Sequence, residues 1–391
     1  MRTSFCCFTV LLGIYAATLA AAPQGVEGDG PLPIALSAPE PPPAPATAWV
    51  YKGFSASGYV DTYYNFNLND PSSRISQDMA LNTTSNQLSL NSATGSFQVD
   101  PAPFGFRVDV GYGRTYDAFY NSEPRHTDWA QYFLNAFVSY KVKKWKGIQF
   151  DFGKFVTSAG AEVAETYLNW NYSRSLLFEF EPLYHTGLRV TMPLTSNWTI
   201  GTQVVTGWNL VRDNNSGKTI GLTSTNTLAK GKVTIANNYY AGPENDDSNI
   251  GWRNFYDLVV AADETRRLSS YLNVDIGSNH NIDGTTSRFR GIAAAGRYRL
   301  RHALAISPRL EYYCDCDGFW TGIPQHLKEV TVTGERKLTA SFIARLEWRR
   351  DWSNKPFFQN GSTPQAVDHQ SMITLGLVAL VRPGMFKSSP E

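Results

Sequence analysis

Residues 373–381 read ITLGLVALV, a run in which apolar side chains occupy every second position from Ile373 onward. Residues 292–301 read IAAAGRYRLR, where an apolar set that begins at Ile292 alternates with three arginines. Successive strand residues point to opposite sides, so each run predicts a strand with one apolar and one polar face. About sixteen such runs follow one another between residues 53 and 381. One sheet of that size with a polar face is typical of a closed barrel in a membrane.

The connections between these runs alternate between long and short. Long connections are expected at about 66–85, 114–131, 156–183, 208–218, 241–252, 277–288, 314–328 and 351–369. Short ones are expected near 98–103, 142–147, 193–197, 226–229, 263–266, 300–303 and 335–338. Outer-membrane barrels have short periplasmic turns and longer outside loops. The sequence therefore predicts an all-β fold, a transmembrane antiparallel β-barrel of about sixteen strands with short periplasmic turns and long extracellular loops.

Composition supports this interpretation and argues against other classes. Lys and Arg number 35 against 34 Asp and Glu, for a net charge of +1, and no basic block suggests a nucleic-acid partner. Mean hydropathy is -0.29, and no internal apolar run is long enough for a transmembrane helix. Aromatic residues gather near the predicted strand ends, as girdles at the two membrane interfaces require. They are Tyr63, Tyr64, Tyr112, Tyr132, Tyr140, Trp198, Trp208 and Tyr312.

The N-terminus is typical of a secretory signal. Arg2 supplies a positive charge, residues 5–19 are apolar, and residues 20–22 are three alanines. We expect a signal peptide at 1–22, a Pro- and Ala-rich periplasmic segment at 23–50, the barrel at 51–386 and a short tail at 387–391. Cleavage of this signal would leave Cys314 and Cys316 as the thiols of the mature chain, either joined in a local disulfide or reduced.

The two faces of the predicted strands separate charge from apolar surface. Phe104, Phe152 and Leu346 belong to the side expected to contact lipid. Charges in the middle of a strand are costly against lipid but tolerated in a water-filled lumen. Asp275 also lies on the interior side. On that argument the other charged residues of this side are the candidates for pore lining. They are Arg107, Asp109, Asp151, Arg189, Arg297, Arg299, Arg309, Glu311, Arg345 and Glu347.

The third long connection, 156–183, is the strongest functional candidate. A loop of this length could fold inward and narrow the pore, where its charges would influence ion selectivity. It could equally be a solvated cap over the barrel rim, and the sequence does not decide between the two. The charged candidates in it are Glu162, Glu165, Arg174, Glu179 and Glu181.

No catalytic or metal-binding pattern stands out. The histidines are scattered without the paired spacing of a metal site. Residues 315–318 (DCDG) resemble a fragment of a calcium loop but lack the later Glu ligand, and a polar turn is the better interpretation. We therefore expect no catalytic residue, metal or cofactor. An outer-membrane hydrolase of lipid or peptide, with a Ser/His/acid group assembled from separate strands, stays open as an alternative.

Several segments, in this order, resemble the OmpL-like β-barrel porins, a family of bacterial outer-membrane barrels. The resemblance runs from 53 to 381, and it implies a porin-like barrel in the outer membrane of a Gram-negative cell. It implies no catalytic residues. The segments are 58–64 (GYVDTYY), 169–175 (NWNYSRS), 182–189 (PLYHTGLR), 309–313 (RLEYY), 317–322 (DGFWTG), 347–351 (EWRRD) and 356–358 (PFF).

Together these observations predict an outer-membrane porin for passive diffusion of small hydrophilic solutes. Arginines and carboxylates alternate on the interior side, so we expect weak charge selectivity. The expected partners are outer-membrane lipid, lipopolysaccharide and the solutes themselves. Homotrimers are common among barrels of this size, although the sequence shows no interface. A secreted, soluble carbohydrate-binding β-protein is a further alternative, and the lipid-facing runs argue against it.

Overall fold

The computed structural model describes residues 49–381, apart from 52, 124–126, 145 and 302. The predicted signal peptide at 1–22, residues 23–48 of the Pro- and Ala-rich segment, and the tail at 387–391 lie outside the described residues. So do His126 and His302. Strand β1 (Trp49–Tyr51) begins just before the expected start of the barrel and pairs with the start of β2.

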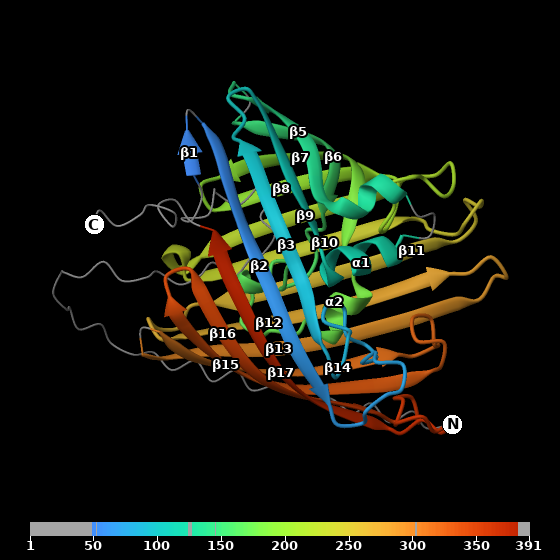
Figure 1. Cartoon of the computed structure of the whole chain (residues 1–391). Coiled ribbons are helices and arrows are strands. Elements are labelled where there is room, and N and C mark those ends of the chain that lie inside the picture. Colours follow the sequence, from blue (N-terminus) through green and yellow to red (C-terminus); the bar gives the residue numbers. More distant parts are fainter. Residues whose placement is uncertain (1–48, 52, 124–126, 145, 302, 382–391) are drawn as a thin grey trace, which may run out of the picture. The chain divides into compact units, whose positions relative to one another are not determined.

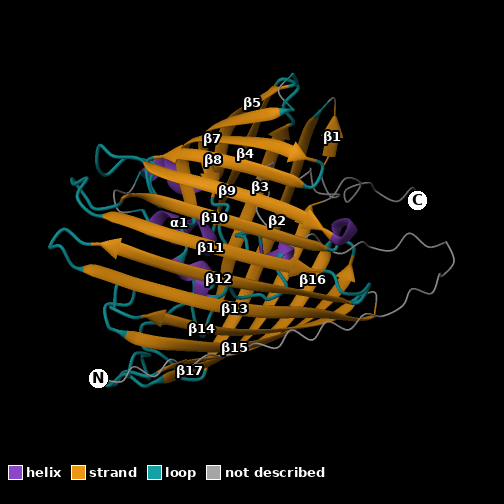
Figure 2. Ribbon diagram, turned by 180° about the vertical axis from the view of Figure 1, so that it is seen from behind, coloured by secondary structure: helices purple, strands orange, loops and turns teal. Residues whose placement is uncertain are grey.

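Sixteen strands, β2 to β17, form a closed antiparallel barrel (Figures 1 and 2). Each strand pairs with its neighbours in the chain, and β17 pairs with β2 through Ile373 opposite Phe66, which closes the ring. The strands are β2 (Phe54–Asn67), β3 (Leu88–Val99), β4 (Phe104–Tyr112), β5 (Phe133–Val142), β6 (Ile148–Val156), β7 (Tyr184–Thr195), β8 (Trp198–Val205), β9 (Thr219–Leu228), β10 (Val233–Pro243), β11 (Trp252–Ala262), β12 (Leu268–His280), β13 (Thr286–Arg301), β14 (Leu304–Asp315), β15 (Gln325–Thr339), β16 (Phe342–Ser353) and β17 (His369–Val381). The predicted fold class is confirmed.

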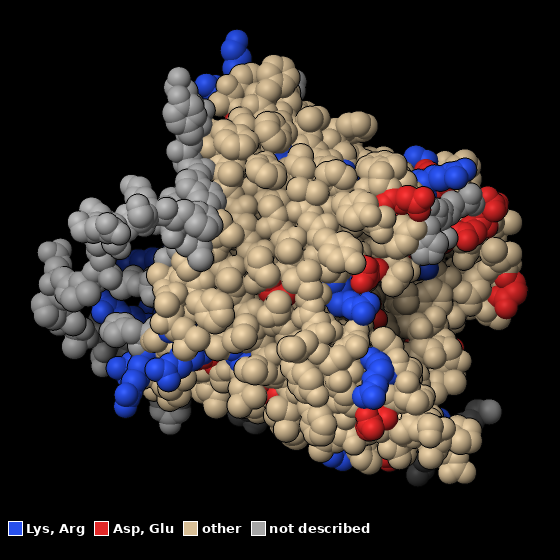
Figure 3. Space-filling view, in the orientation of Figure 1, with Lys and Arg blue, Asp and Glu red and all other residues tan. Residues whose placement is uncertain are grey.

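The alternation of the sequence becomes an outer apolar surface and a polar interior. Phe104 is 73% exposed and Leu346 is 60% exposed on the outside, whereas Arg345, one position from Leu346, is 1% exposed. Figure 3 shows the same separation on one face, where Lys, Arg, Asp and Glu gather toward the ends of the strands and the middle is largely uncharged. A barrel surface of this kind suits contact with hydrocarbon.

Two sequence predictions need correction here. The long connection expected at 277–288 is much shorter, because β12 and β13 pair as far as His280 opposite Thr286 and leave only 281–285 as the turn. Polar, glycine-containing strand ends resemble loop sequence, which explains the error. Among the expected girdle residues, Tyr63 and Trp208 are 1% and 4% exposed and do not face lipid. Their strand-end position did not fix which side they face.

Helical segments are short. They are α1 (Arg114–Asn121), α2 (Leu176–Phe180) and the 3-10 turns η1 (Asp128–Tyr132), η2 (Thr166–Leu168) and η3 (Ala229–Gly231). Over the described part of the chain, none of the helices has the length and apolar character needed to cross a membrane. Apolar residues of α1 pack with α2 and with the long connection 68–87 in one buried cluster, which includes Leu81, Tyr116 and Phe178.

Candidate functional site: the third loop inside the barrel

The connection between β6 and β7, residues 157–183 and hereafter loop 3, lies inside the ring of strands (Figures 1 and 2). It contains η2 and α2. The side chain of Ser175 caps α2 by accepting a hydrogen bond from the backbone N–H of Phe178 (3.0 Å), a common way to begin a helix. Most residues of loop 3 are buried, including its polar ones. A buried connection must find partners for its backbone groups, and the barrel wall supplies them.

Arg345 on β16 is the first of three wall arginines that hold loop 3. Its Nη1 donates to the carbonyl oxygens of Thr166 (2.7 Å) and Asn171 (3.0 Å), and its Nη2 donates to that of Asn169. Glu335 on β15 accepts from Nε and Nη2 of the same guanidinium at 2.9 and 2.7 Å. A charged donor that satisfies three loop carbonyls fixes both the position and the path of the loop.

Arg309 on β14 and Arg349 on β16 hold the segment that follows. Nη1 of Arg309 donates to Glu162 Oε1 (2.8 Å) and to the carbonyl oxygen of Ser173 (2.9 Å). Nη2 of Arg309 and Nη1 of Arg349 both donate to the carbonyl oxygen of Arg174, at 3.0 and 2.6 Å. Neither arginine is more than 1% exposed. The loop backbone is therefore the partner of two wall cations.

Wall carboxylates bind the backbone N–H groups and hydroxyls of the same loop. Glu347 on β16 accepts from the backbone N–H of Tyr172 (2.6 Å) and of Ser173 (3.0 Å). Glu311 on β14 accepts from the N–H of Leu176 (2.8 Å), at the start of α2. Asp61 on β2 accepts from the hydroxyls of Thr166 (2.6 Å) and Tyr172 (2.7 Å). Arginines and carboxylates of the wall therefore both hold loop 3.

Arg174 organises loop 3 from within. Its guanidinium donates to the carbonyl oxygens of Val163 (2.7 Å), Tyr172 (2.7 Å) and Ala164 (2.9 Å). Glu162, besides its ion pair with Arg309, accepts from the backbone N–H of Ser175 (2.6 Å). These bonds join the first and last parts of the loop into one compact unit.

A glycine on the wall makes room for the loop. The ring of Tyr172 lies against Gly376 of β17 so closely that a Cβ there would come within 2.2 Å of ring carbon atoms. Real Cβ contacts are never that short, so a larger residue at 376 would displace the ring. Gly376 therefore belongs to the docking surface of loop 3.

The remaining pore-lining candidates lie on strands β4, β6, β7 and β13. Arg189 on β7 donates to Asp151 on β6 through Nε (3.0 Å) and Nη2 (2.9 Å). Arg107 on β4 pairs with Asp109 (2.9 Å), and its Nη2 lies 3.6 Å from Oε1 of Glu165 in loop 3.

Toward the short-turn end of β13, the interior cations differ in their exposure and partners. Arg297 pairs with Glu335 at 2.6 Å. Arg299 is half-buried near this end of β13. Most of the interior charges named from the sequence therefore occur as ion pairs.

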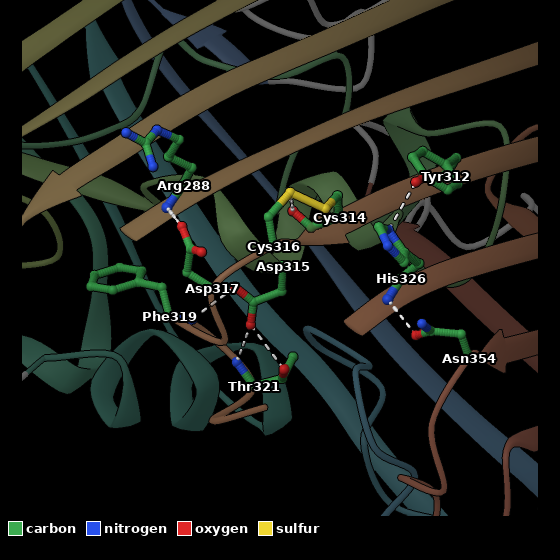
Figure 4. Close-up of a disulfide and its surroundings, with 10 residues drawn as sticks. All are labelled: Arg288, Tyr312, Cys314, Asp315, Cys316, Asp317, Phe319, Thr321, His326 and Asn354. Atoms are coloured by element: carbon green, nitrogen blue, oxygen red, sulfur yellow. Dashed lines mark hydrogen bonds between the residues drawn. A yellow bond between two sulfur atoms is a disulfide. The ribbon is translucent and has the colours of Figure 1, made fainter. Parts of the chain in front are cut away.

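The end of loop 3 is covered by the connection 316–324. Phe180 of α2 stacks on Tyr313 and Trp320, with ring centroids 4.5 and 6.1 Å apart. Asp315 shapes this cover, because its carboxylate accepts from the backbone N–H groups of Phe319, Trp320 and Thr321. Figure 4 shows the bonds to Phe319 and Thr321.

The stretch 315–318 is thus a polar turn. Cys314 and Cys316 form a disulfide beside Asp315, at the end of β14 (Figure 4). The sequence left open whether these cysteines form a local disulfide or stay reduced, and the structure has the disulfide.

Glu179, on α2, is the loop 3 carboxylate with the clearest change in acidity. Burial raises the pKa of Glu179 to about 7, against a smaller opposing effect of the Arg349 guanidinium. A carboxyl group with that pKa changes its charge near neutral pH. Glu181, which follows α2, is 4% exposed and lies beside wall carboxylates on β11 and β12.

The sequence analysis named loop 3 and, as pore-lining candidates, four of the wall residues that hold it, which are Arg309, Glu311, Arg345 and Glu347. Arg349, Asp61 and Gly376 were missed, although Asp61 is the one charged residue of β2. Asp257 was missed as well, although its place among apolar neighbours on β11 was a signal of an interior position. The four described histidines have separate local contacts. His185 Nδ1 lies 3.0 Å from the carbonyl oxygen of Gly207, and His280, His326 and His369 bond Thr286, Tyr312 and Asp368.

The family described as "Putative beta-barrel porin-2, OmpL-like" matches residues 53–381 of this chain. The chain belongs to this family. The match covers the whole barrel, from the residue before β2 to the end of β17. This porin-like barrel is accordingly a protein of the outer membrane.

Solved outer-membrane proteins share the fold at low sequence identity. An anion-selective porin from Comamonas acidovorans is 10% identical, with a TM-score of 0.57 over 84% of this chain and 99% of that one. OmpT, an outer membrane protein of Vibrio cholerae, is 11% identical, with a TM-score of 0.56 over 86% and 100%. The outer membrane channel DcaP of Acinetobacter baumannii is 10% identical, with a TM-score of 0.56 over 85% and 99%. The chain matches no curated protein.

Proposed function

We propose that this protein is a channel for passive diffusion of small hydrophilic solutes, and that loop 3 sets the width of the passage. The observation that carries the proposal is the position of loop 3, which lies inside the barrel and is bonded to three wall arginines. A barrel of about sixteen strands is wide enough for an aqueous channel. A loop held across that space leaves a passage only for small molecules.

The pairing of the interior charges supports weak charge selectivity. Arg107 faces Asp109, Arg189 faces Asp151 and Arg349 faces Asp351, at distances between 2.8 and 2.9 Å. A paired guanidinium and carboxylate present little net field to a passing ion. Other candidates, such as Arg309, Arg345 and Glu347, are bonded to loop 3, and we expect little discrimination between anions and cations.

Family membership supports a channel over an outer-membrane hydrolase. A Vibrio cholerae OmpT structure is described as a trimer form, with a TM-score of 0.55 to this chain, which supports a homotrimer as part of the proposal. We also propose that residues 1–22 are removed during export, and that the outer apolar surface contacts lipid and lipopolysaccharide. Intact mass of the mature protein and size-exclusion chromatography with light scattering test the cleavage and the trimer.

Swelling of proteoliposomes tests the diffusion proposal directly. Detergent-refolded protein is placed in vesicles, and uptake of neutral sugars of increasing size is followed by light scattering. The proposal expects fast uptake of the smallest sugars and a steep fall with size. Equal rates in vesicles with and without correctly inserted protein would refute it.

A further inference from the structure

Three carboxylates meet in the interior where loop 3 contacts β11 and β12. Glu181 follows α2, Asp257 lies on β11 and Asp275 on β12, and one oxygen of each lies within 4.8 Å of the others. They are 4%, 0% and 2% exposed. Buried like charges at this separation repel strongly unless a cation or protons compensate them.

The neutral groups around the cluster do not balance its charge. Asn238 donates to Asp257 (2.8 Å), and Nδ2 of Asn273 donates to both Asp257 (2.8 Å) and Asp275 (3.1 Å). Among the residues that the structure describes, no Lys or Arg forms an ion pair with any of the three. By contrast, the interior carboxylates Asp151 and Asp351 pair with Arg189 and Arg349.

A second observation points to a ligand. Oε1 of Glu181 is buried and has no hydrogen-bond partner among the described residues. The same carboxylate is pressed toward the loop backbone, because a Cβ at Gly160 would lie 2.1 Å from Oε2 of Glu181. A buried, unpartnered carboxylate oxygen is costly, and a bound cation removes that cost without protonation of the cluster.

We propose that Glu181, Asp257 and Asp275 bind one Ca²⁺ ion, which fastens the end of loop 3 to the barrel wall. The donors are all oxygen atoms, which suits a hard cation, and the set contains none of the nitrogen or sulfur ligands that favour zinc. Ca²⁺ accepts irregular arrangements of carboxylates and completes its shell with water, whereas Mg²⁺ demands a regular octahedron. The ion would join two wall strands, β11 and β12, to the end of loop 3.

Calorimetric titration of refolded protein with CaCl₂ tests the site. The protein is refolded from lipopolysaccharide-free inclusion bodies and stripped with EDTA, because lipopolysaccharide itself binds Ca²⁺. We expect one Ca²⁺ per chain. Glu181→Gln should lower the affinity by about tenfold or more, and Asp257→Asn with Asp275→Asn should abolish binding. Glu165→Gln, in the same loop but paired with Arg107, is the matched control and should leave binding unchanged.

Trypsin cleavage after Arg174, the loop's one Lys or Arg residue, gives a second readout that does not depend on channel activity. Ca²⁺ should slow this cleavage in the wild type and leave Glu181→Gln unaffected. In EDTA, Glu181→Gln should melt at or above the wild-type temperature, since one of three repelling charges is gone. Heat-modifiable migration on gels confirms that each variant is folded. No heat of binding by folded wild type, or equal binding by wild type and the double variant, would overturn the proposal.

Discussion

Replacing Arg345 by Gln should release loop 3 from the wall. The change removes three hydrogen bonds from a charged donor to the carbonyl oxygens of Thr166, Asn169 and Asn171. Such bonds contribute about 1.5–3 kcal/mol each, and water entering the lumen replaces part of that loss. Glu335 keeps Arg297 at 2.6 Å, so no carboxylate is left without a cation. We expect a net loss of about 3 kcal/mol in loop docking, which raises the undocked population by about two orders of magnitude.

Limited proteolysis measures that population. Trypsin reaches Arg174 only when loop 3 leaves the wall, because Arg174 is 1% exposed in the docked loop. When closing is fast relative to cleavage, the cleavage rate follows the open population and should rise about a hundredfold in Arg345→Gln. Arg345→Lys keeps the charge but not the planar guanidinium, so its cleavage rate should lie between those of the wild type and Arg345→Gln.

The matched control is Arg299→Gln, a change at another interior-facing arginine, near the short-turn end of β13. Within the described chain, Arg299 has no hydrogen bond to loop 3. Mass spectrometry identifies cleavage after Arg174 among cuts in other loops. Equal cleavage rates in Arg345→Gln and the wild type, with both proteins folded, would refute the assignment of Arg345 as a main anchor of loop 3.

Three further predictions follow from single contacts. Gly376→Ala should push the Tyr172 ring off the wall and speed cleavage of loop 3, whereas in a Tyr172→Ala background the same change should add little, as a double-mutant cycle can measure. Because burial raises the pKa of Glu179 from 4.5 to about 7, the folded protein binds this proton more tightly than the unfolded chain, and stability should fall as pH rises through that interval. Glu179→Gln should remove this loss of stability, which amounts to about 3 kcal/mol between pH 4.5 and 7, and an unchanged pH dependence in thermal melts would contradict the assignment. Replacing Cys314 and Cys316 by Ser should cost only about 1–2 kcal/mol of unfolding free energy in chemical denaturation, because the disulfide closes a very short loop.

The barrel itself could be predicted from the sequence because the residue pattern that specifies each strand is local. Alternation along a strand decides which side chains face lipid, so Leu346 and Arg345 were separated correctly without knowledge of any partner. The short turns and long loops are equally local. The length of the turn after His280 could not be predicted, because polar strand ends and loops use the same residue types.

The interior of the barrel could be predicted only in part. The sequence named Glu162 and Arg309 as interior charges, yet the two residues are 147 positions apart and no local pattern pairs them. Whether loop 3 folds inward depends on the sum of such distant contacts, and the sequence left both readings open. The carboxylate cluster was also hidden, since it joins a loop residue to strands β11 and β12.

Single-channel recording in a planar bilayer, with wild type and Arg345→Gln compared under a salt gradient, shows whether the barrel conducts and whether loop 3 limits the current. A loop-limited, weakly selective porin should give discrete ohmic steps with a reversal potential near zero, and larger steps from Arg345→Gln. Absence of steps from both proteins, when folding and insertion have been verified, would contradict the claim that this barrel is a diffusion channel.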